Sequence, residues 1–372
     1  MRTSVGRAGI VGGGIAGLGA AIALSQAGWE VTVYERADRF TEVGAGVILS
    51  ANALRALDVL GLGAEIRSHL IEDRPGTVRN QRGRILINAR IDDFVGGLVA
   101  MHRADLISIL AAAVPHEQVR LGAEVVRVDE QGRIETLDGT AQYDLVVAAD
   151  GVHSRVRAAL WPRLGPVRRT GIAAWRWILD RPAPGNVGVV WGRHAECGVV
   201  PMAGDRTMCF AAARPPVRSL DHFLDWPDPV PSLIAAVDPA RIVTGELLEI
   251  AVPQQLWRGR VVLIGDAAHA MRPTLGQGAC LALEDAVVMA DCAPDLARYS
   301  ALRRRRVAAM SIVSRHGMRL TAPGSTSVAA LRDLATSALP DAAAVRLLRA
   351  ANTRLLGTWE RPSRETIVVG ET

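Results

Sequence analysis

The most informative absence from this chain of 372 residues is lysine, since all 43 of its basic side chains are arginines. Without lysine, the chain cannot use a P-loop lysine, a Schiff-base lysine or a lysine that carries an activated halogen. Cysteine is scarce as well, and the four cysteines show neither close pairs nor a neighbouring histidine cluster: Cys197, Cys209, Cys280 and Cys292. The sequence therefore predicts buried free thiols instead of a zinc site or a disulfide framework.

Long apolar runs are also few. The run over residues 8–27 follows two arginines and has the look of a signal peptide or a membrane span, but it contains glycines at positions 12, 13, 14, 17 and 19. A phosphate-binding turn explains those glycines better than a membrane segment does. We therefore expect a cytoplasmic protein without an integral membrane segment.

The charge balance is basic, with a net charge of +5 and a pI near 9.5. The arginines are scattered, and their one dense run, residues 303–306, lies in an expected helix over residues 296–310. We interpret this run as a solvated helix face and expect no nucleic-acid partner. A positive field could still attract an anionic cofactor or a carboxylated substrate.

A glycine-rich turn near the N-terminus has the pattern Gly12-x-Gly14-x-x-Gly17, between an apolar run that ends at residue 11 and an expected helix over residues 16–27. The first glycine permits a tight turn, the second lets the backbone approach a pyrophosphate, and the third allows close packing of helix on strand. The helix N-terminus then faces the phosphates. A strand over residues 29–34 follows and ends at Glu35, whose carboxylate can accept hydrogen bonds from ribose hydroxyls.

Two further glycine motifs, Asp150-Gly151 and Gly265-Asp266, lie far from the first. We expect an α/β fold with a discontinuous Rossmann-like domain and a second domain built on an antiparallel β-sheet, which contains six of the eight tryptophans. The expected divisions are residues 1–75, 98–160 and 258–320 for the Rossmann-like domain, 76–97 and 161–257 for the β-sheet domain, and 321–372 for C-terminal helices.

Local patterns give the expected elements. A hairpin is expected over residues 78–91, and the last helices, over residues 327–339 and 341–356, are expected to serve packing. The expected strands cover residues 119–128, 134–137, 145–149, 187–191, 198–202, 207–212 and 260–264, and a helix covers residues 278–290.

Taken together, these motifs resemble the single-component FAD-dependent aromatic hydroxylases, the para-hydroxybenzoate and salicylate hydroxylase family of flavoprotein monooxygenases. The resemblance spans most of the chain, and its motifs occur in the family's order and near its spacing. Four segments carry it: GGGIAG at 12–17, HRADL at 102–106, DLVVAADGVHSRVR at 144–157 and GDAAHAMRPTLGQG at 265–278.

The resemblance implies roles for individual residues. Glu35 would hold the adenosine ribose, Arg103 the diphosphate region, and Asp266 a ribityl hydroxyl or the pyrophosphate. The loop from Pro273 to Gly278 would lie beside the isoalloxazine ring, and the 150–151 motif would contact both FAD and the nicotinamide. His153 and His269 either share in these contacts or only cap and pack. The expected FAD contacts are Gly12, Gly14, Ala16, Gly17, Glu35, Arg36, Arg103, Val125, Asp150, Asp266, Pro273, Gly276 and Gly278.

The resemblance also implies the chemistry. FAD is bound, NADH or NADPH binds transiently in a groove and reduces it, and molecular oxygen forms a flavin C4a-hydroperoxide. That species hydroxylates an aromatic or heteroaromatic small molecule, while the protein positions the substrate and excludes water.

Substrate contacts are harder to assign. A tyrosine base is doubtful, because all three tyrosines fall on expected cofactor-domain strands or a late helix. The candidates to hold the substrate are Arg176, His194 and Arg206, although for each of them a solvent-facing strand position is the stronger interpretation. The side chains that could line an aromatic pocket or simply pack in a core are Trp175, Trp191, Met202, Met208 and Phe210.

Three other functions compete with hydroxylation. The segment from Trp175 to Asp180 partly resembles the W-x-W-x-I-P element of flavin-dependent halogenases, but Asp180 replaces the proline and no lysine is present. An epoxidase or tailoring oxygenase acting on a larger polycyclic or alkene substrate is the main alternative. A non-catalytic FAD-binding or redox-sensing protein would need a damaged cofactor site, and the motifs are intact.

Overall fold

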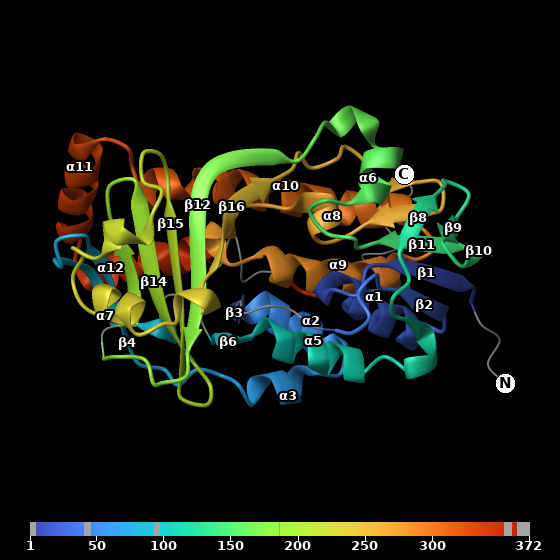
Figure 1. Ribbon diagram of the computed structural model, residues 1–372, viewed down its shortest axis with the longest axis horizontal. Coiled ribbons are helices and arrows are strands. Elements are labelled where there is room, and N and C mark those ends of the chain that lie inside the picture. The colour runs from blue at the N-terminus through green and yellow to red at the C-terminus, as the bar shows by residue number, and fades with distance from the viewer. Residues whose placement is uncertain (1–4, 41–45, 93–96, 186, 353–358, 363–372) are drawn as a thin grey trace.

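The structure is a computed structural model that describes residues 5–40, 46–92, 97–185, 187–352 and 359–362. Its two large sheets lie at opposite ends of an elongated molecule, with β1 (Arg7–Val11) at the right of Figure 1 and β12 (Arg168–Leu179) at the left. Helices α9 (Gly278–Cys292) and α10 (Leu296–Thr321) run between the two ends. The N-terminal βαβ unit therefore lies at the end opposite the tryptophan-rich sheet.

The first sheet is mainly parallel, with β17 alone pairing antiparallel at its edge. Its central strands β1, β11 and β18 are almost wholly buried and apolar, as expected for parallel strands covered on both faces. Helix α1 packs against α9 so closely that a Cβ at Gly19 would lie 3.3 Å from the Cβ of Ala286. In order across the sheet, the strands are β17 (Trp257–Arg258), β18 (Val261–Leu263), β11 (Leu145–Ala148), β1 (Arg7–Val11), β2 (Glu30–Tyr34) and β7 (Val119–Arg120).

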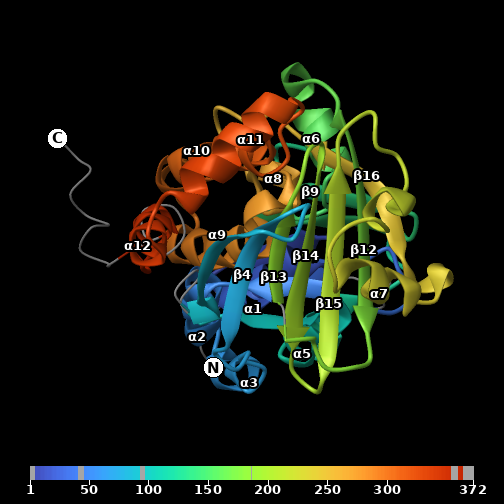
Figure 2. The same cartoon turned by 90° about the vertical axis from the view of Figure 1, so that its left-hand side faces the viewer.

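The second sheet is antiparallel apart from the parallel pair β13 and β4. Figure 2 shows α10 and α11 beside this sheet, which faces the viewer there. In order, its strands are β16 (Val243–Glu249), β12 (Arg168–Leu179), β15 (Arg206–Ala213), β14 (Ala195–Met202), β13 (Val187–Trp191), β4 (Pro75–Asn80) and β5 (Ile85–Arg90).

Two small sheets complete the strands. One has the order β10 (Gly139–Gln142), β9 (Arg133–Thr136) and β8 (Val125–Val128), and the other pairs β3 (Gly46–Leu49) with β6 (Val99–His102). Ile48 of β3 and Ala100 of β6 pack with Ile178, Met202 and Met208 of the second sheet. The β3–β6 pair therefore provides one apolar contact between the two ends of the molecule.

Helices cover both sheets, and α10 spans them: it packs on α9, while its Met318 joins a cluster with Ile172 and Ala174 of the second sheet. None of the described helices is both long enough and apolar enough to cross a membrane. The α-helices are α1 (Ile15–Gln26), α2 (Ala51–Val59), α3 (Gly63–Arg67), α5 (Arg103–Ala112), α6 (Arg155–Leu160), α7 (Val230–Ala235), α8 (Asp266–His269), α9 (Gly278–Cys292), α10 (Leu296–Thr321), α11 (Thr326–Ser337) and α12 (Asp341–Asn352). Short 3-10 turns are η1 (His116–Gln118), η2 (Pro162–Leu164), η3 (Leu220–Phe223), η4 (Pro239–Arg241) and η5 (Pro273–Leu275).

The expected α/β class, the N-terminal βαβ unit and the 78–91 hairpin are confirmed, and all four cysteines are buried free thiols. The expected single strand over 119–128 is wrong, because the chain turns at Gly122 with φ +68° and splits it into β7 and β8. The helix expected to end at residue 310 continues to Thr321. The domain divisions stay a prediction.

The two C-terminal helices differ from the expectation that their apolar residues serve packing. Ala344 of α12 packs against β4 and β5, but on α11 Val328, Leu331 and Leu334 are exposed. Arg332 is the buried residue of α11, and it donates a hydrogen bond to the carbonyl of Thr321 at 2.8 Å. Residues 353–356, expected to extend the last helix, lie outside the described residues.

Candidate active site

The three glycine motifs meet at one edge of the first sheet. Strand register places Val11 beside both Tyr34 and Ala148, and Ala148 beside Leu263. These residues end four neighbouring parallel strands, so the segments that follow them leave the sheet at its carboxyl edge. In sheets of this kind, ligands bind outside that edge. Residues separated by more than 250 positions in the sequence thereby form one site.

Gly12 and Gly17 lie so close to neighbouring backbone atoms that neither position has room for a side chain, as the motif predicts. Gly12 has φ +102°, and a Cβ there would lie 2.5 Å from the carbonyl oxygen of Ala149. A Cβ on Gly17 would lie 1.9 Å from the carbonyl oxygen of Gly12. Larger residues at either position would therefore push the turn, α1 and the second glycine motif apart.

Gly14 differs because it borders open space. A Cβ built there meets nothing within 4 Å, and Gly151, with φ +80°, is equally open. Gly14 is also the N-cap of α1 and provides no side-chain hydrogen bond to the first turn of the helix. Free N–H groups and the positive end of the helix dipole at an open helix start suit an anionic diphosphate.

Asp150 offers a second feature that fits a dinucleotide. Its Oδ2 accepts a hydrogen bond from the Val156 amide at 3.2 Å, but its Oδ1 is buried without a hydrogen-bond partner among the described residues. Burial raises the pKa of this carboxyl, although hydrogen bonds from Ser154 and nearby amides oppose the rise. A ligand hydroxyl at Oδ1 would satisfy the remaining acceptor.

The third motif lies against the first. Gly265 has φ +55°, and a Cβ there would lie 2.7 Å from the Cβ of Ala16. Asp266 is exposed at the start of α8, and a Cβ on Gly278 would lie 3.9 Å from its Oδ1. Its carboxylate thus faces the N-terminus of α9, as a contact to a shared ligand requires. The loop between them includes η5 and Gly276, which has φ +64°.

Four further residues are expected to contact FAD: Glu35, Arg36, Arg103 and Val125. Glu35 accepts hydrogen bonds from the Gly13 amide at 2.7 Å and the Ala37 amide at 2.9 Å, which leaves acceptor capacity for ribose hydroxyls. Arg36 beside it is exposed, and Val125 is half-buried at the start of β8. Arg103 is the first residue of α5.

Arg157 ties two of the motifs together, a role that the sequence did not reveal although the residue belongs to the 144–157 segment. Its guanidinium donates to the carbonyl of Val152 at 2.6 Å and to that of Ala267 at 3.0 Å. Burial lowers its pKa, while the charges of Asp150 and Asp266 raise it. Arg157 therefore fixes the distance between the segments that carry these two carboxylates.

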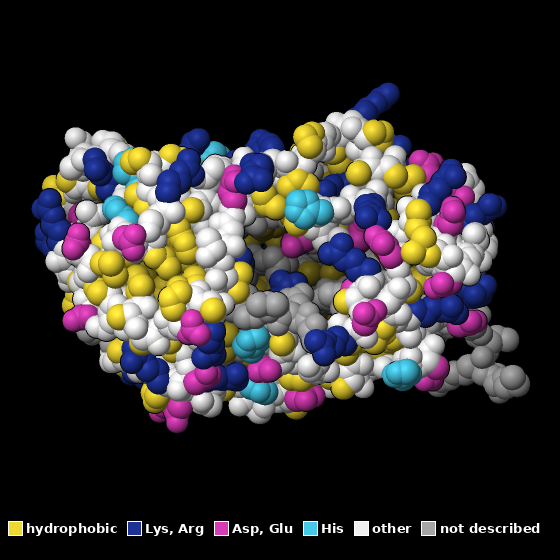
Figure 3. Space-filling view, viewed as in Figure 1, with side chains coloured by type: hydrophobic (Ala, Val, Ile, Leu, Met, Phe, Trp, Pro, Cys, Tyr) yellow, Lys and Arg dark blue, Asp and Glu magenta, His cyan; other side chains and the backbone are white. Residues whose placement is uncertain are grey.

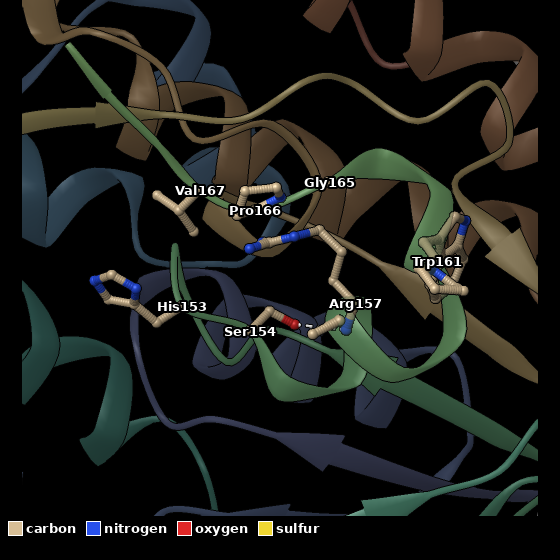
Figure 4. Close-up of a pocket in the computed structure, with 9 residues that line it drawn as sticks. His153, Ser154, Arg157, Trp161, Gly165, Pro166 and Val167 are labelled. Atoms are coloured by element: carbon tan, nitrogen blue, oxygen red, sulfur yellow. Dashed lines mark hydrogen bonds between the residues drawn. The ribbon is translucent and has the colours of Figure 1, made fainter.

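A cavity of about 390 Å³ adjoins this arginine. Figure 4 shows the Arg157 side chain lying between Ser154 and the turn from Gly165 to Val167, with Trp161 at one end and His153 at the other. His153 is exposed. The cavity therefore follows directly on the Asp150-Gly151 motif.

We call the site formed by the three glycine motifs the cradle. The second sheet turns one face toward the β3–β6 pair and the cradle. Along β12, Trp175 and Trp177 pack in a cluster covered by α7, whereas Ala174 and Ile178 pack in clusters shared with α10 and β6. Because side chains alternate along a strand, Arg176 lies on the same face as Ala174 and Ile178. Figure 3 shows that the molecule is hollowed between its two ends.

Arg176 is the charged residue in the middle of this face. Its Nε is buried without a hydrogen-bond partner among the described residues. Burial lowers its pKa, and the nearby charge of Arg103 lowers it further. Met202 and Met208 share its face of the sheet, whereas Trp175 and Trp191 pack in other clusters.

The three substrate-binding candidates do not come together. Arg206 forms an ion pair with Asp105 of α5 at 3.3 Å. His194 has φ +66° and lies in the turn between β13 and β14, where its amide donates to the carbonyl of Pro323 at 3.0 Å. Only Arg176 of the three lies in the centre of the face turned toward the cradle. The roles of all three stay predictions.

A buried ionic network supports the third motif, and it corrects the expectation that residues 303–306 form a solvated face. Arg303 is 1% exposed and donates to Asp285 at 2.7 Å and to Glu284 at 2.6 Å. Arg306 donates to the same Glu284 at 2.6 Å. The carboxylates that pair with Arg303 and Arg306 both come from α9, which packs against α10.

His269 belongs to the same network. Its Nε2 lies 2.6 Å from Oδ2 of Asp285, which also accepts from the Gly265 amide at 3.0 Å. His269 is completely buried. Of the two readings left open for this histidine, its packing supports a structural role: it holds the backbone of the Gly265-Asp266 motif through Asp285.

This network predicts an acid limit to stability. Burial alone would raise the pKa of Asp285, but the charges and hydrogen bonds of His269 and Arg303 lower it from 3.8 to about 2. The unfolded chain therefore takes up a proton before the folded chain does. We expect about 2 kcal/mol of stability that is present above pH ~4 and lost as the pH falls from about 4 to about 2. Urea unfolding across this pH range measures it, and an equal pH dependence in Asp285→Asn would contradict it.

Comparisons with known proteins agree with this geometry. The chain matches the FAD binding domain family over residues 5–292. It is 36% identical to the aurachin C monooxygenase/isomerase of Stigmatella aurantiaca, over 80% of this chain and 85% of the relative. It is 34% identical to the 2-heptyl-3-hydroxy-4(1H)-quinolone synthase of Mycobacteroides abscessus, over 77% of this chain and 81% of that protein. The structure of HpxO from Klebsiella pneumoniae with FAD and uric acid matches with a TM-score of 0.84 and 27% identity, over 94% of this chain and 97% of that one. The chain belongs to the FAD-dependent aromatic monooxygenases.

Proposed function

We propose that this monooxygenase hydroxylates an electron-rich nitrogen heteroaromatic ring that carries a hydroxyl or oxo group and an apolar substituent. The observation that carries the proposal is the face of the second sheet turned toward the cradle. It presents one half-buried arginine, Arg176, whose Nε is buried, among apolar side chains that include Ile178, Met202 and Met208. Relatives named for a heptyl-quinolone and a neighbour complexed with uric acid support the same substrate class.

The positions of the residues indicate which groups bind FAD and which orient the substrate. Bound FAD would supply the redox chemistry, with NADH or NADPH as the reductant and molecular oxygen as the oxidant. The open turn at Gly14 and the start of α1 bind its diphosphate, and Glu35, Asp150 and Asp266 accept hydrogen bonds from its hydroxyls. Arg176 orients the anionic or polarised oxygen of the substrate. The apolar wall formed by Ile178, Met202 and Met208 excludes water. The enzyme acts in the cytoplasm on a diffusible small molecule.

A second candidate is a tailoring oxygenase acting on a larger substrate. It is favoured by the 36% identity to a relative named as both a monooxygenase and an isomerase. The same wall of Met202 and Met208 would then accommodate a longer substituent, since methionine side chains adapt to irregular shapes.

A substrate panel tests the proposal. NADH and NADPH oxidation by the FAD-loaded enzyme is followed together with oxygen and peroxide, over phenolic acids, hydroxypyridines, alkylquinolones and polycyclic phenols. We expect a hydroxylated or oxo-substituted nitrogen heterocycle to accelerate flavin reduction without equivalent release of peroxide. Stimulation by polycyclic phenols alone would favour the tailoring oxygenase, and stimulation by none would refute both candidates.

Arg176→Gln should raise KM for the substrate by about 10- to 100-fold, because a hydrogen bond to a charged group contributes roughly 1.5–3 kcal/mol. The KM for the reductant should not change. Stability should be maintained, since no ion pair joins Arg176 to a carboxylate in the part of the chain that the structure describes. Arg181→Gln is the matched control, because Arg181 is exposed beyond the end of the same strand. Equal KM values for the two variants would remove Arg176 from the substrate site.

A further inference from the structure

A second cavity, of about 470 Å³, shares one residue, Arg272, with the 265–278 motif and is otherwise lined by residues outside the motifs of the cradle. Its lining comes from β12, the β13–β14 turn, the end of β15, the loop before η5, and α10. None of its lining residues is a carboxylate. We call it the arginine pocket, after the residues that define it: Arg214, Arg272, Arg315 and Arg319, with His194 and Thr170.

One carboxylate behind the pocket is shared among several of these cations. Glu249 is 2% exposed and pairs with Arg272 at 3.0 Å, with Arg315 at 3.3 Å, and with Arg168 outside the pocket. No ion pair joins Arg214 or Arg319 to a carboxylate among the residues described. The pocket therefore holds a surplus of positive charge.

The arginines lie close enough to act on one another. Burial lowers the pKa of Arg214 and the charges of Arg272 and Arg319 lower it further, while the charge of the buried Glu196 raises it. Burial and then the charges of Arg315 and Arg319 lower the pKa of Arg272 in the same way. Like charges that converge on a cavity repel one another unless an anion lies between them.

We propose that the arginine pocket binds a phosphate group. A guanidinium presents a planar fork that matches two phosphate oxygens, and a phosphate has enough oxygens for several such forks at once. Two sources supply this chemistry: the diphosphate of the nicotinamide dinucleotide, and free phosphate or pyrophosphate. The first source rests on the proposed function, whereas the second does not.

Such a ligand would act on the loop that leads to η5. The hydroxyl of Ser314 on α10 donates to the carbonyl of Arg272, and the hydroxyl of Thr274 donates to the carbonyl of Ser314 at 3.2 Å. The guanidinium of Arg272 donates to the carbonyl of Arg315 at 2.9 Å. A phosphate held by Arg272 and Arg315 together would add a further link between this loop and α10, next to the segment from Pro273 to Gly278.

Calorimetric titration of the FAD-loaded enzyme with sodium pyrophosphate tests the site without turnover. We expect one saturable site, weakened at least about tenfold in Arg319→Gln and Arg214→Gln. Arg305→Gln is the matched control, because it removes the same charge from α10. Arg305 is exposed and lies outside the pocket. If Arg214→Gln loses FAD, Arg319→Gln decides alone, because Arg319 is exposed.

Steady-state kinetics distinguish the two sources. If the dinucleotide is the ligand, pyrophosphate competes with NADH or NADPH, and Arg319→Gln raises KM for the dinucleotide but not for the substrate. If KM for the dinucleotide is unchanged while pyrophosphate binding is weakened, free phosphate is the ligand. The proposal is overturned if pyrophosphate shows no saturable binding, or if Arg319→Gln binds it as tightly as Arg305→Gln. An enzyme inactive on every substrate leaves the calorimetric result intact.

Discussion

Gly14→Ala should lower the affinity for FAD by about 100-fold, or roughly 2.7 kcal/mol, while the apoprotein stays folded. Gly14 has an ordinary φ of −78°, and the added methyl group meets no protein atom within 4 Å. The methyl group instead occupies the space in front of α1, where the backbone must approach the diphosphate. Titration of apoprotein with FAD, followed by flavin fluorescence, measures the loss, and circular dichroism checks the fold.

Gly245→Ala is the matched control. Gly245 lies on β16 in the other sheet, and a Cβ there also meets nothing within 4 Å. The same chemical change should leave the FAD affinity within about twofold, since it removes no contact and enters no binding site. If Gly14→Ala binds FAD as tightly as Gly245→Ala, the diphosphate does not lie at the start of α1.

Arg303→Met should lower the free energy of unfolding by about 3–5 kcal/mol. The guanidinium is the shared partner of Glu284 and Asp285, both completely buried, and methionine leaves these carboxylates without it in a medium that solvates charge poorly. Arg306 still pairs with Glu284, so Asp285 loses more than Glu284 does. Urea unfolding at pH 7 with saturating FAD measures the change.

The control for this variant lies two residues further along the same helix. Arg305 is exposed, and Arg305→Met should change the free energy of unfolding by no more than about 0.5 kcal/mol. A loss in Arg303→Met no larger than in the control would mean that the two carboxylates are uncharged in the folded protein, against the lowered pKa of Asp285.

The sequence alone predicted the features that depend on local chemistry. The turn at Gly12 is one example, because its positive φ and its contact with Ala149 leave no room for a side chain. The strand positions in the second sheet are another, because alternation over residues 187–191 marks a strand wherever it pairs. The family assignment likewise rested on contiguous motifs and is confirmed.

What the sequence could not predict depends on partners far along the chain. The burial of Arg303 follows from its two carboxylates on α9, and nothing near residue 303 identifies them. Alternation along β12 separates Arg176 from Trp175, but it does not say which face turns toward the cradle. The arginine pocket is hidden for the same reason, since Arg214 and Arg319 are more than 100 positions apart.

Because the residues of the cradle are scattered over the sequence, the ribosome synthesises them at different times. The first glycine turn leaves the ribosome early, but the carboxylate of Asp266 and the start of α9 at Gly278 come from the last third of the chain. The complete FAD site therefore does not exist until most of the protein has been synthesised. Because FAD stabilises the folded state only after this site exists, the nascent chain must fold its first βαβ unit without help from the cofactor. The supply of FAD then influences how many finished chains remain folded, and has no part in how the first of their strands pair.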